Sequence, residues 1–331
     1  MYKDPLLPTT RKLAAGPERG PDPTAAISIR GLAKRYGDFV AVDGLDLDIR
    51  RGEIFALLGP NGAGKTTTVE ILEGYRGRSA GEVVVLGADP ADADRRWRQR
   101  IGIVLQDSRM HPELTVRESI ELFAGYYHAP RGVDETVELV GLTEKADDRV
   151  ARLSGGQQRR LDVGLALIGD PELLFLDEPT TGFDPAARRR AWEVIASLRD
   201  LGKAIFLTTH YMEEAQELAD RVAIISGGRI VAEGSPDELT HRDQRGATIR
   251  FRLPEGVTAA ELPGGLTPDA DGIAVNGDVQ IRAEDPVRAL HDLTAWALAR
   301  SVRLTELEVR QPDLEDVYLE LTTDAPEEVP Q

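Results

Sequence analysis

The sequence predicts an α/β fold with a largely parallel core sheet, followed by a small α+β domain. Short apolar runs alternate with segments of helical spacing, as in proteins whose parallel strands are connected by helices. The runs are apolar throughout, which is expected of strands covered on both faces. After residue 246 the pattern changes to alternating strands and two helical segments, which indicates a separate domain.

The first domain is expected to span residues 26–240. It opens with two segments whose alternation predicts antiparallel strands, 27–36 and 44–49. The apolar runs follow at 54–59, 101–106, 173–178, 204–210 and 221–226. Helices are predicted at 65–74, at 115–127, where Thr115 and Glu118 form a capping box, and at 185–202, which begins with proline and ends at glycine.

The second domain is expected to span residues 247–323. Its alternating segments predict strands at 247–253, 272–277, 278–283 and 302–310, and its helical segments lie at 285–301 and 313–322. Residues 1–25 are rich in proline, glycine and charge without hydrophobic periodicity, so we expect a disordered tail there. Residues 324–331 form a second, short tail.

Composition and charge limit the partners and the cellular compartment that the protein can have. The 331 residues include 40 basic and 57 acidic side chains, a net charge of −17, which argues against nucleic acid as a partner. The chain has no cysteine, which favours a reducing cytoplasm. No apolar run approaches the roughly 20 residues that span a bilayer, and no signal-peptide core follows Met1. If the protein works at a membrane, we expect another chain to supply the helices.

The stretch GPNGAGKT, followed by Thr67, has the sequence and context of a phosphate-binding loop, because it follows an apolar run and opens a helix. The glycines let the backbone wrap a phosphate, Lys65 would neutralise the β and γ phosphates, and the Thr66 hydroxyl would bind Mg²⁺. The predicted ATP-binding residues of this loop are Gly59, Pro60, Asn61, Gly62, Ala63, Gly64, Lys65, Thr66 and Thr67.

Five further polar or aromatic residues lie at or after the ends of predicted strands. Asp177 and Glu178 end an apolar run at the sheet edge where ligands bind, so Asp177 would hold Mg²⁺ and Glu178 would orient the attacking water. Gln106 could reach the metal and the water from the same edge, and His210 could hydrogen-bond the γ-phosphate. Tyr36 could anchor a loop or stack on adenine, and the residue types alone favour neither.

A second glycine pair lies in LSGGQQRR, where Ser154 is a plausible helix N-cap and the helix behind it is amphipathic. This stretch has no lysine and no preceding apolar strand, so it cannot be a complete second nucleotide site. By itself it could also be a simple glycine-rich turn into a helix.

Taken together, these motifs resemble those of the ATP-binding-cassette (ABC) ATPases over about residues 27–240. The order matches: aromatic Tyr36, phosphate loop, Gln106, signature LSGGQ at 153–157, Asp177 with Glu178, the loop TTGFDP with Asp184, and His210. The resemblance implies a P-loop NTPase nucleotide-binding domain with a parallel core sheet, an antiparallel β subdomain and a helical subdomain. It also implies ATP and Mg²⁺ as cofactors.

The resemblance further implies that two cassettes pair head to tail as a homodimer. Each signature would close over the γ-phosphate held by the other chain, and the residues acting in trans would be Ser154, Gly155, Gly156, Gln157 and Asp184. Family members carry leucine or a similar residue where this chain has Phe183, and Gln158 and Asp162 also depart from the commonest helix pattern. Phe183 is a mild departure that leaves the Asp184 carboxylate in place, and Gln158 and Asp162 lie outside the expected phosphate contacts.

Two segments suggest what the ATPase drives. Residues 107–118 lie where transporter cassettes resemble one another in docking a membrane helix, so we expect a separate multi-span permease there. The ending LEVRQPDLEDVYLELT resembles the accessory domain of daunorubicin-resistance exporters, which pair with six-span permeases and export antibiotics, other drugs or lipids. The cassette would then lie at the cytoplasmic face of the membrane.

Two other functions compete with export. A soluble cassette ATPase acting on ribosomes or DNA would resemble tandem cassettes or carry a long coiled-coil insertion, and this chain has one cassette and no such insertion. An importer cassette would need a binding-protein system, and the second domain favours export over it.

Overall fold

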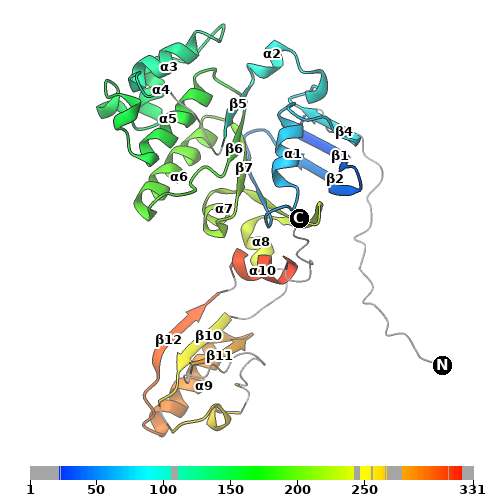
Figure 1. Ribbon diagram of the computed structural model, residues 1–331. Coiled ribbons are helices and arrows are strands. Elements are labelled where there is room, and N and C mark those ends of the chain that lie inside the picture. Colours follow the sequence, from blue (N-terminus) through cyan, green and yellow to red (C-terminus); the bar gives the residue numbers. More distant parts are fainter. Residues whose placement is uncertain are drawn as a thin grey trace, which may run out of the picture.

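The computed structural model describes residues 22, 24–105, 111–241, 247–254, 256–264, 266, 278–311 and 313–322. The chain folds into a large domain, which we call the cassette, and a smaller one, which we call the accessory domain (Figure 1). Within the described ranges no helix is both long enough and apolar enough to cross a membrane.

The cassette is built on a six-stranded sheet with the order β5-β6-β7-β3-β8-β9. Every neighbouring pair is parallel except the hairpin of β8 and β9. The strands are β3 (Ile54–Leu58), β5 (Ile101–Val104), β6 (Leu173–Asp177), β7 (Ala204–Thr209), β8 (Arg221–Ser226) and β9 (Arg229–Gly234). This confirms the predicted parallel core, while β9 is an antiparallel edge strand that the sequence did not indicate.

A three-stranded antiparallel sheet of order β2-β1-β4 lies beside the core sheet. Its strands are β1 (Ile27–Tyr36), β2 (Phe39–Ile49) and β4 (Ala80–Val85). The predicted pair is present, although β2 begins five residues earlier than expected. The third strand, β4, was not predicted, since Gly81 interrupts its pattern.

In the described part of the cassette, helices surround these sheets: α1 (Lys65–Leu72), α2 (Arg95–Arg98), α3 (Val116–Ala124), α4 (Val133–Leu139), α5 (Gly155–Leu167), α6 (Pro185–Asp200), α7 (Met212–Leu218) and α8 (Pro236–His241). Thr115 and Glu118 form the predicted capping box at the start of α3. The helix ends at Ala124 rather than continuing through Tyr127. Helices α3, α4 and α5 pack together as a helical subdomain (Figure 1).

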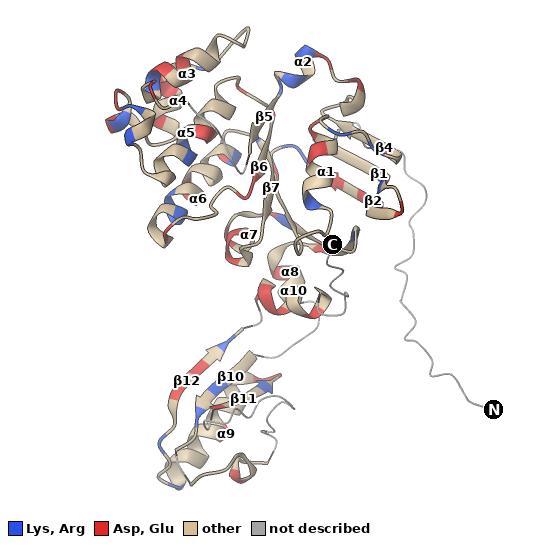
Figure 2. Ribbon diagram, in the orientation of Figure 1, with Lys and Arg blue, Asp and Glu red and all other residues tan. Residues whose placement is uncertain are grey.

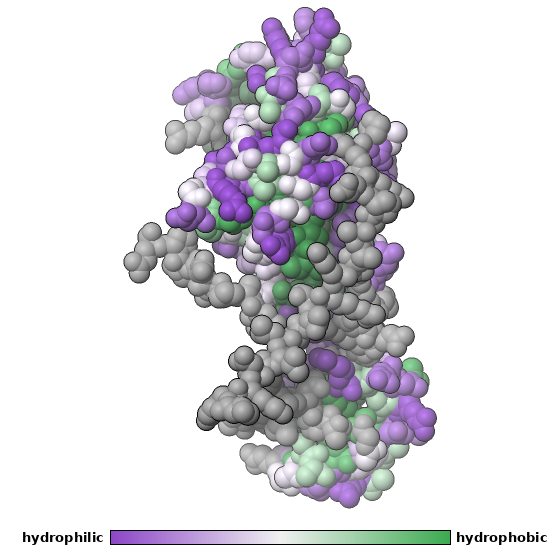
Figure 3. Space-filling view, turned by 90° about the vertical axis from the view of Figure 1, so that its right-hand side faces the viewer, coloured by the Kyte–Doolittle hydropathy of each residue, from purple (hydrophilic) through white to green (hydrophobic). Residues whose placement is uncertain are grey.

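The core sheet is buried on both faces, which explains its uninterrupted apolar runs. Along β3, Ile54, Ala56 and Leu58 point into the core shared with the helical subdomain. Phe55 and Leu57 point into the core shared with the antiparallel sheet and α1. Hydrophilic residues cover much of the face shown in Figure 3, with smaller hydrophobic patches between them.

The accessory domain is a three-stranded antiparallel sheet of order β11-β10-β12 with one helix packed on it. Its elements are β10 (Ala247–Arg252), β11 (Asp278–Ala283), α9 (Pro286–Ala299) and β12 (Thr305–Arg310). The strand predicted at 272–277 lies outside the described residues. Phe251, Ile281 and Leu293 are at the centre of this domain's own hydrophobic core.

The last helix, α10 (Leu314–Thr322), does not pack on the accessory sheet. It contacts α7, α8 and β8 of the cassette, and Leu314 belongs to the cassette's core. The sequence placed residues 313–322 in the second domain because they follow it without a break. In the structure the chain leaves the accessory domain after β12 and returns to the cassette (Figure 1).

Candidate functional site

The phosphate-binding loop connects β3 to α1 and needs glycine at two positions for steric reasons. A Cβ atom on Gly59 would lie 2.5 Å from the backbone oxygen of Ile225. One on Gly64 would lie 2.4 Å from the oxygen of Ala41, and Gly64 also has a φ of 104°. The loop is therefore held against β8 and β2 by contacts that only glycine permits.

Lys65 lies inside this loop, and only 8% of it is exposed. Its Nζ donates hydrogen bonds to the carbonyl oxygens of Gly59 at 2.6 Å and Pro60 at 3.0 Å. Burial lowers the pKa of Lys65, and the nearby carboxylates of Glu178 and Asp177 oppose that shift. An anionic ligand would add favourable charge where the ammonium group is short of solvent.

Two carboxylates stand at the carboxyl end of β6. Asp177 accepts a hydrogen bond from the hydroxyl of Thr208 on β7. Glu178 has the left-handed backbone conformation, φ 46°, which costs a non-glycine residue about 1–2 kcal/mol. Its N–H donates to the Thr208 oxygen at 3.0 Å, and its carboxylate accepts from the Thr181 hydroxyl at 3.1 Å. Strand β7 thus holds Glu178 in an unusual but defined position.

His210 follows β7 and faces the same carboxylate. Its Nδ1 lies 3.5 Å from Oε1 of Glu178. Its ring lies against that of Tyr211, with the ring centroids 4.1 Å apart and the planes tilted by 38°. The guanidinium of Arg188 lies 4.2 Å from the centroid of the Tyr211 ring. The imidazole therefore has the Tyr211 ring as a close, tilted neighbour.

These groups share one cavity of about 800 Å³. It is lined by Tyr36, Phe39, Ala41, Gly59, Pro60, Asn61, Gly62, Gly64, Lys65, Thr66, Thr67, Asp177, Glu178, His210 and Tyr318. The structure thus brings together most of the residues predicted to bind ATP in cis. Ala63 is the exception, because its side chain is buried and does not line the cavity. Gln106 lies outside the described residues.

Tyr36 ends β1 at the rim of this cavity, and 41% of it is exposed. The Nζ of Lys34 lies 5.1 Å and the guanidinium carbon of Arg76 lies 5.4 Å from its ring centroid. An exposed ring at the mouth of a phosphate-binding cavity offers a surface on which a base can stack.

The signature residues occupy a different place. Ser154 and Gln157 form a capping box at the start of α5: the Ser154 N–H donates to Gln157 Oε1 at 2.8 Å, and the Gln157 N–H donates to Ser154 Oγ at 3.3 Å. Ser154, Gly155, Gly156 and Gln157 line a separate cavity of about 540 Å³, together with Glu178 and Asp184. None of the four lines the cavity that holds Lys65.

Asp184 caps α6 in this structure. Its Oδ1 accepts hydrogen bonds from the N–H groups of Ala186 at 3.0 Å and Ala187 at 2.9 Å. Phe183, the predicted departure from the family pattern, lies close to the signature, since a Cβ on Gly156 would be 4.0 Å from its ring. The departure therefore affects packing beside the signature and leaves the carboxylate in place.

Arg159 is a structural residue of the site that the sequence analysis missed. It is buried on α5 and donates to the backbone oxygens of Asp177 at 2.6 Å and Pro179 at 3.2 Å, and also to that of Leu105. It therefore ties the signature helix to the ends of β5 and β6. An arginine in a helix usually indicates a solvated surface, and its backbone partners carry no sequence signal.

The fold and the order of motifs along this sheet edge define an ATP-binding cassette. The chain belongs to the ABC transporter family, whose model matches residues 42–181, and it is a cassette ATPase of that family. A second model, described as the C-terminal domain of ABC transporter domain-containing protein-like proteins, matches residues 247–312. That match ends just before α10.

Two similar proteins cover almost the whole chain. The daunorubicin resistance ATP-binding protein DrrA3 of Streptomyces coeruleorubidus is 40% identical, covering 90% of this chain and 96% of its own length. The Nod factor export ATP-binding protein I of Burkholderia pseudomallei is 41% identical, covering 90% and 97%.

Solved structures of ATP-binding cassettes match about two thirds of the chain. CbiO1 of Clostridium perfringens, part of the ABC transporter complex cbiONQ, has a TM-score of 0.59 and 28% identity, and covers 65% of this chain and 90% of that chain. The cassette MJ0796, solved as a dimer in a post-hydrolysis state with ADP and Pi, has a TM-score of 0.56 and 25% identity, with coverages of 63% and 98%.

Proposed function

We propose that this protein is the ATP-hydrolysing subunit of an ABC exporter and that two copies close on ATP. The observation that carries the proposal is the separation of the two cavities. Lys65 and the signature glycines both belong to anion-binding helix starts, yet they line different cavities of one chain. A second chain in head-to-tail contact would bring its signature over the γ-phosphate.

Within the cavity, each residue has a chemical role in hydrolysis. Tyr36 would stack on the adenine, and the loop N–H groups with Lys65 would hold the β and γ phosphates. Glu178 would orient a water molecule for in-line attack, so that a bond forms to the γ-phosphorus while the bond to the bridging oxygen breaks. His210, 3.5 Å from Glu178, would hydrogen-bond the γ-phosphate and link it to that carboxylate.

The residues present fit Mg²⁺. Thr66 and Asp177 line the cavity with oxygen donors, and Gln106 would contribute a third. Within the described ranges no cluster of three His, Cys, Asp or Glu side chains could hold a metal unaided, which suits an ion that shares its shell with phosphates and water. When bound, Mg²⁺ would neutralise charge on the phosphate oxygens.

ATP would close the dimer because it alone contacts both chains. ADP lacks the γ-phosphate that the partner's Ser154, Gly155 and Gly156 would grip, so the closed state loses its preferential ligand after hydrolysis. Asp184 would lie at the same seam. Binding therefore closes the two cassettes, and hydrolysis releases them.

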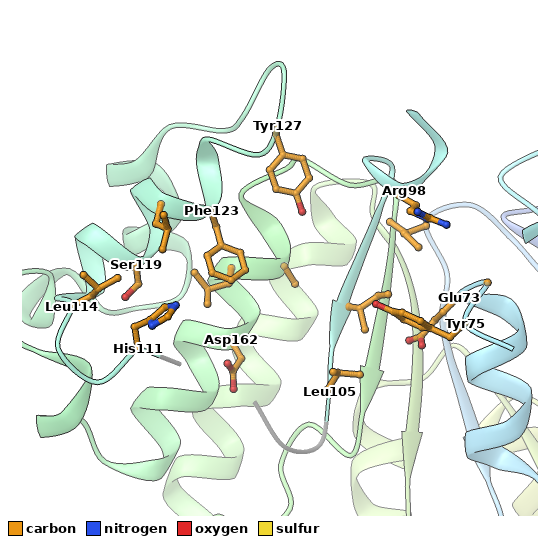
Figure 4. Close-up of a pocket in the computed structure, with 16 residues that line it drawn as sticks. Glu73, Tyr75, Arg98, Leu105, His111, Leu114, Ser119, Phe123, Tyr127 and Asp162 are labelled. Atoms are coloured by element: carbon orange, nitrogen blue, oxygen red, sulfur yellow. The ribbon is translucent and has the colours of Figure 1, made fainter. Parts of the chain in front are cut away.

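A groove between the core sheet and the helical subdomain would receive a cytoplasmic helix of the permease. Its volume is about 510 Å³, and Leu105, Leu114, Leu122, Phe123 and Tyr127 give it apolar walls. Figure 4 shows Phe123 and Tyr127 on the helical side, facing Tyr75 and Leu105 across the cavity. His111 and Leu114 come from the segment predicted to dock a membrane helix, whose residues 107–110 lie outside the described ranges.

The groove also holds an acidic group suited to a cationic partner. Glu73 is 6% exposed, and burial, with smaller contributions from the charges of Asp177 and Glu70, raises its pKa to about 8. Asp162, which departs from the family pattern, is also buried in the groove wall. An amphipathic helix carrying one basic side chain would satisfy both the apolar walls and the Glu73 carboxyl.

The relatives indicate the direction of transport. One is named for daunorubicin resistance and the other for Nod factor export. We infer that this protein powers efflux of a drug, antibiotic or lipid-like substrate. It would act through a separate six-span permease, bound at the cytoplasmic face of the membrane.

The catalytic part of the proposal is tested with Glu178→Gln. The amide keeps the shape but loses the charge that orients water, so ATP turnover should fall by about 10²-fold or more. The variant should accumulate as an ATP-bound dimer by size-exclusion chromatography, whereas Glu193→Gln on α6 should behave as wild type. Near-normal turnover of Glu178→Gln would refute the assignment.

The transport part is tested by co-expressing the cassette with the membrane protein encoded beside it. We expect a multi-span protein to co-purify with the cassette in mild detergent. Replacing Leu122 in the groove by Asp should abolish that association, while Leu201→Asp, outside the groove, should not. Purification of the cassette without any multi-span partner would contradict the proposal.

A further inference from the structure

The structure places the last helix of the chain, α10, between the accessory domain and the ATP cavity. Leu314 is completely buried in the cassette core, and Val317 and Tyr318 pack against the same core. The helix follows β12 within a few residues, so one end of it is tied to the accessory sheet. Figure 1 shows it lying beside α8, beneath the core sheet.

Tyr318 lines the cavity that also holds Lys65, Glu178 and His210. It is half-buried, and burial raises the pKa of its phenol, so the hydroxyl remains a neutral donor. No motif of the ATPase reaction requires an aromatic residue from outside the cassette at this place. Its presence makes α10 part of the wall of the nucleotide site.

Two of the elements that α10 contacts, β8 and α7, lie next to the phosphate loop and the histidine. Strand β8 lies beside the loop, since a Cβ on Gly59 would be 2.5 Å from the backbone oxygen of Ile225 on β8. Helix α7 begins two residues after His210. Tyr318 therefore lies on a helix that packs against β8, beside the phosphate loop, and against α7, which follows His210.

Acidic residues lie on both sides of the contact between α10 and α7. Glu213 and Glu217 of α7 line a small cavity together with Asp313 and Glu315 at the start of α10. Arg310 offsets part of the negative charge on α10, because it forms ion pairs with Asp313 and, at 4.0 Å, with Glu315. Figure 2 shows acidic residues on both facing helices. On α7, Glu213 is paired with Arg188 at 3.8 Å. The helix is thus held mainly by its apolar residues, because exposed ion pairs contribute little, so one added contact can change how firmly it docks.

We propose that Tyr318 contacts the bound nucleotide and that ATP thereby fastens α10, and with it the accessory domain, to the cassette. The proposal deepens the proposed function and rests on the ATP site assigned there. It gives the accessory domain a defined role, in which its position responds to nucleotide occupancy through a single helix. Loss of γ-phosphate or nucleotide would loosen the same helix.

The first test is a titration of the purified full-length protein with a fluorescent ATP analogue in the presence of Mg²⁺. Tyr318→Ala should weaken binding by about 3- to 10-fold, since an aromatic contact is lost, and Tyr318→Phe should lie between it and wild type. Leu319→Ala, at an exposed neighbouring position on α10, should bind as wild type does. Affinity of Tyr318→Ala within 1.5-fold of wild type, in a folded protein, would overturn the proposal.

The second test uses the wild-type protein, so it does not depend on whether a variant folds. In the wild-type protein, the ATP analogue should slow amide hydrogen exchange in residues 314–322 by about 10-fold or more. Unchanged exchange there would overturn the proposal even if nucleotide binds normally. Failure to find a permease would instead refute the transport function and leave both of these measurements valid.

Discussion

Helices α1 and α5 both begin at glycine-containing turns, yet they are built to meet phosphate differently. The N-cap of α1 is Gly64, which makes no side-chain cap, and Lys65 follows it directly. The N-cap of α5 is Ser154, and its first turn is closed by a reciprocal bond with Gln157. The start of α1 offers an anion free N–H groups and the Lys65 ammonium. The start of α5 is capped by its own side chains and has no cation.

In the proposed dimer, this difference is the reason why the signature would need a second chain to bind ATP. A capped helix start can still face a phosphate with its remaining N–H groups and dipole, but it supplies only part of the needed charge. In the proposed dimer, the missing charge would come from Lys65 of the other chain. Substitutions at three places on these helices test this difference: one at the start of α5, one further along α5 and one at the far end of α1.

The largest expected effect is that of Gly155→Asp. Gly155 is exposed, and no atom lies within 4 Å of an added Cβ, so an aspartate fits and even suits the first turn of a helix. Its charge would repel the γ-phosphate of the partner's ATP. We expect ATP binding to be retained and turnover to fall by about 10²-fold.

Gly155→Ala is the matched control, because it adds a side chain without charge and should keep most of the activity. Thermal unfolding would show that both variants are folded. Equal turnover of the aspartate and alanine variants would mean that the signature does not face a phosphate.

The second effect concerns Arg159, the residue of α5 that reaches the sheet edge. Arg159→Leu would leave the backbone oxygens of Asp177, Pro179 and Leu105 without this donor in a buried place. We expect a loss of about 3 kcal/mol in the free energy of unfolding, measured by urea denaturation. Arg160→Leu, one position along and bonded only to an exposed carbonyl, should cost much less. Equal losses would show that the carbonyl contacts contribute little.

The comparison also shows what sequence could and could not predict. The glycines, Lys65, Asp177 and His210 were predictable, because chemistry at phosphate demands those residue types at fixed places along strands and helices. Arg159 and Tyr318 were not, because their partners are backbone atoms or a distant part of the chain. Helix α10 was predicted as a helix, and its return to the cassette depends on Leu314 finding a core that no local pattern specifies.

The smallest effect lies at the far end of α1, where Glu73 is the C-cap residue. Its pKa is raised to about 8 from the ordinary 4.5, so the folded state holds its proton more tightly than the unfolded chain does. The stability contributed by that proton is present below about pH 4.5 and is lost as the pH rises through 8.

Glu73→Gln keeps a neutral side chain at every pH. We therefore expect it to exceed wild type in stability by about 2 kcal/mol at pH 9, with the difference vanishing near pH 4. Urea denaturation across this range would measure it, with exposed Glu121→Gln as the control, and parallel pH profiles for wild type and Glu73→Gln would show that the groove does not hold a protonated carboxyl.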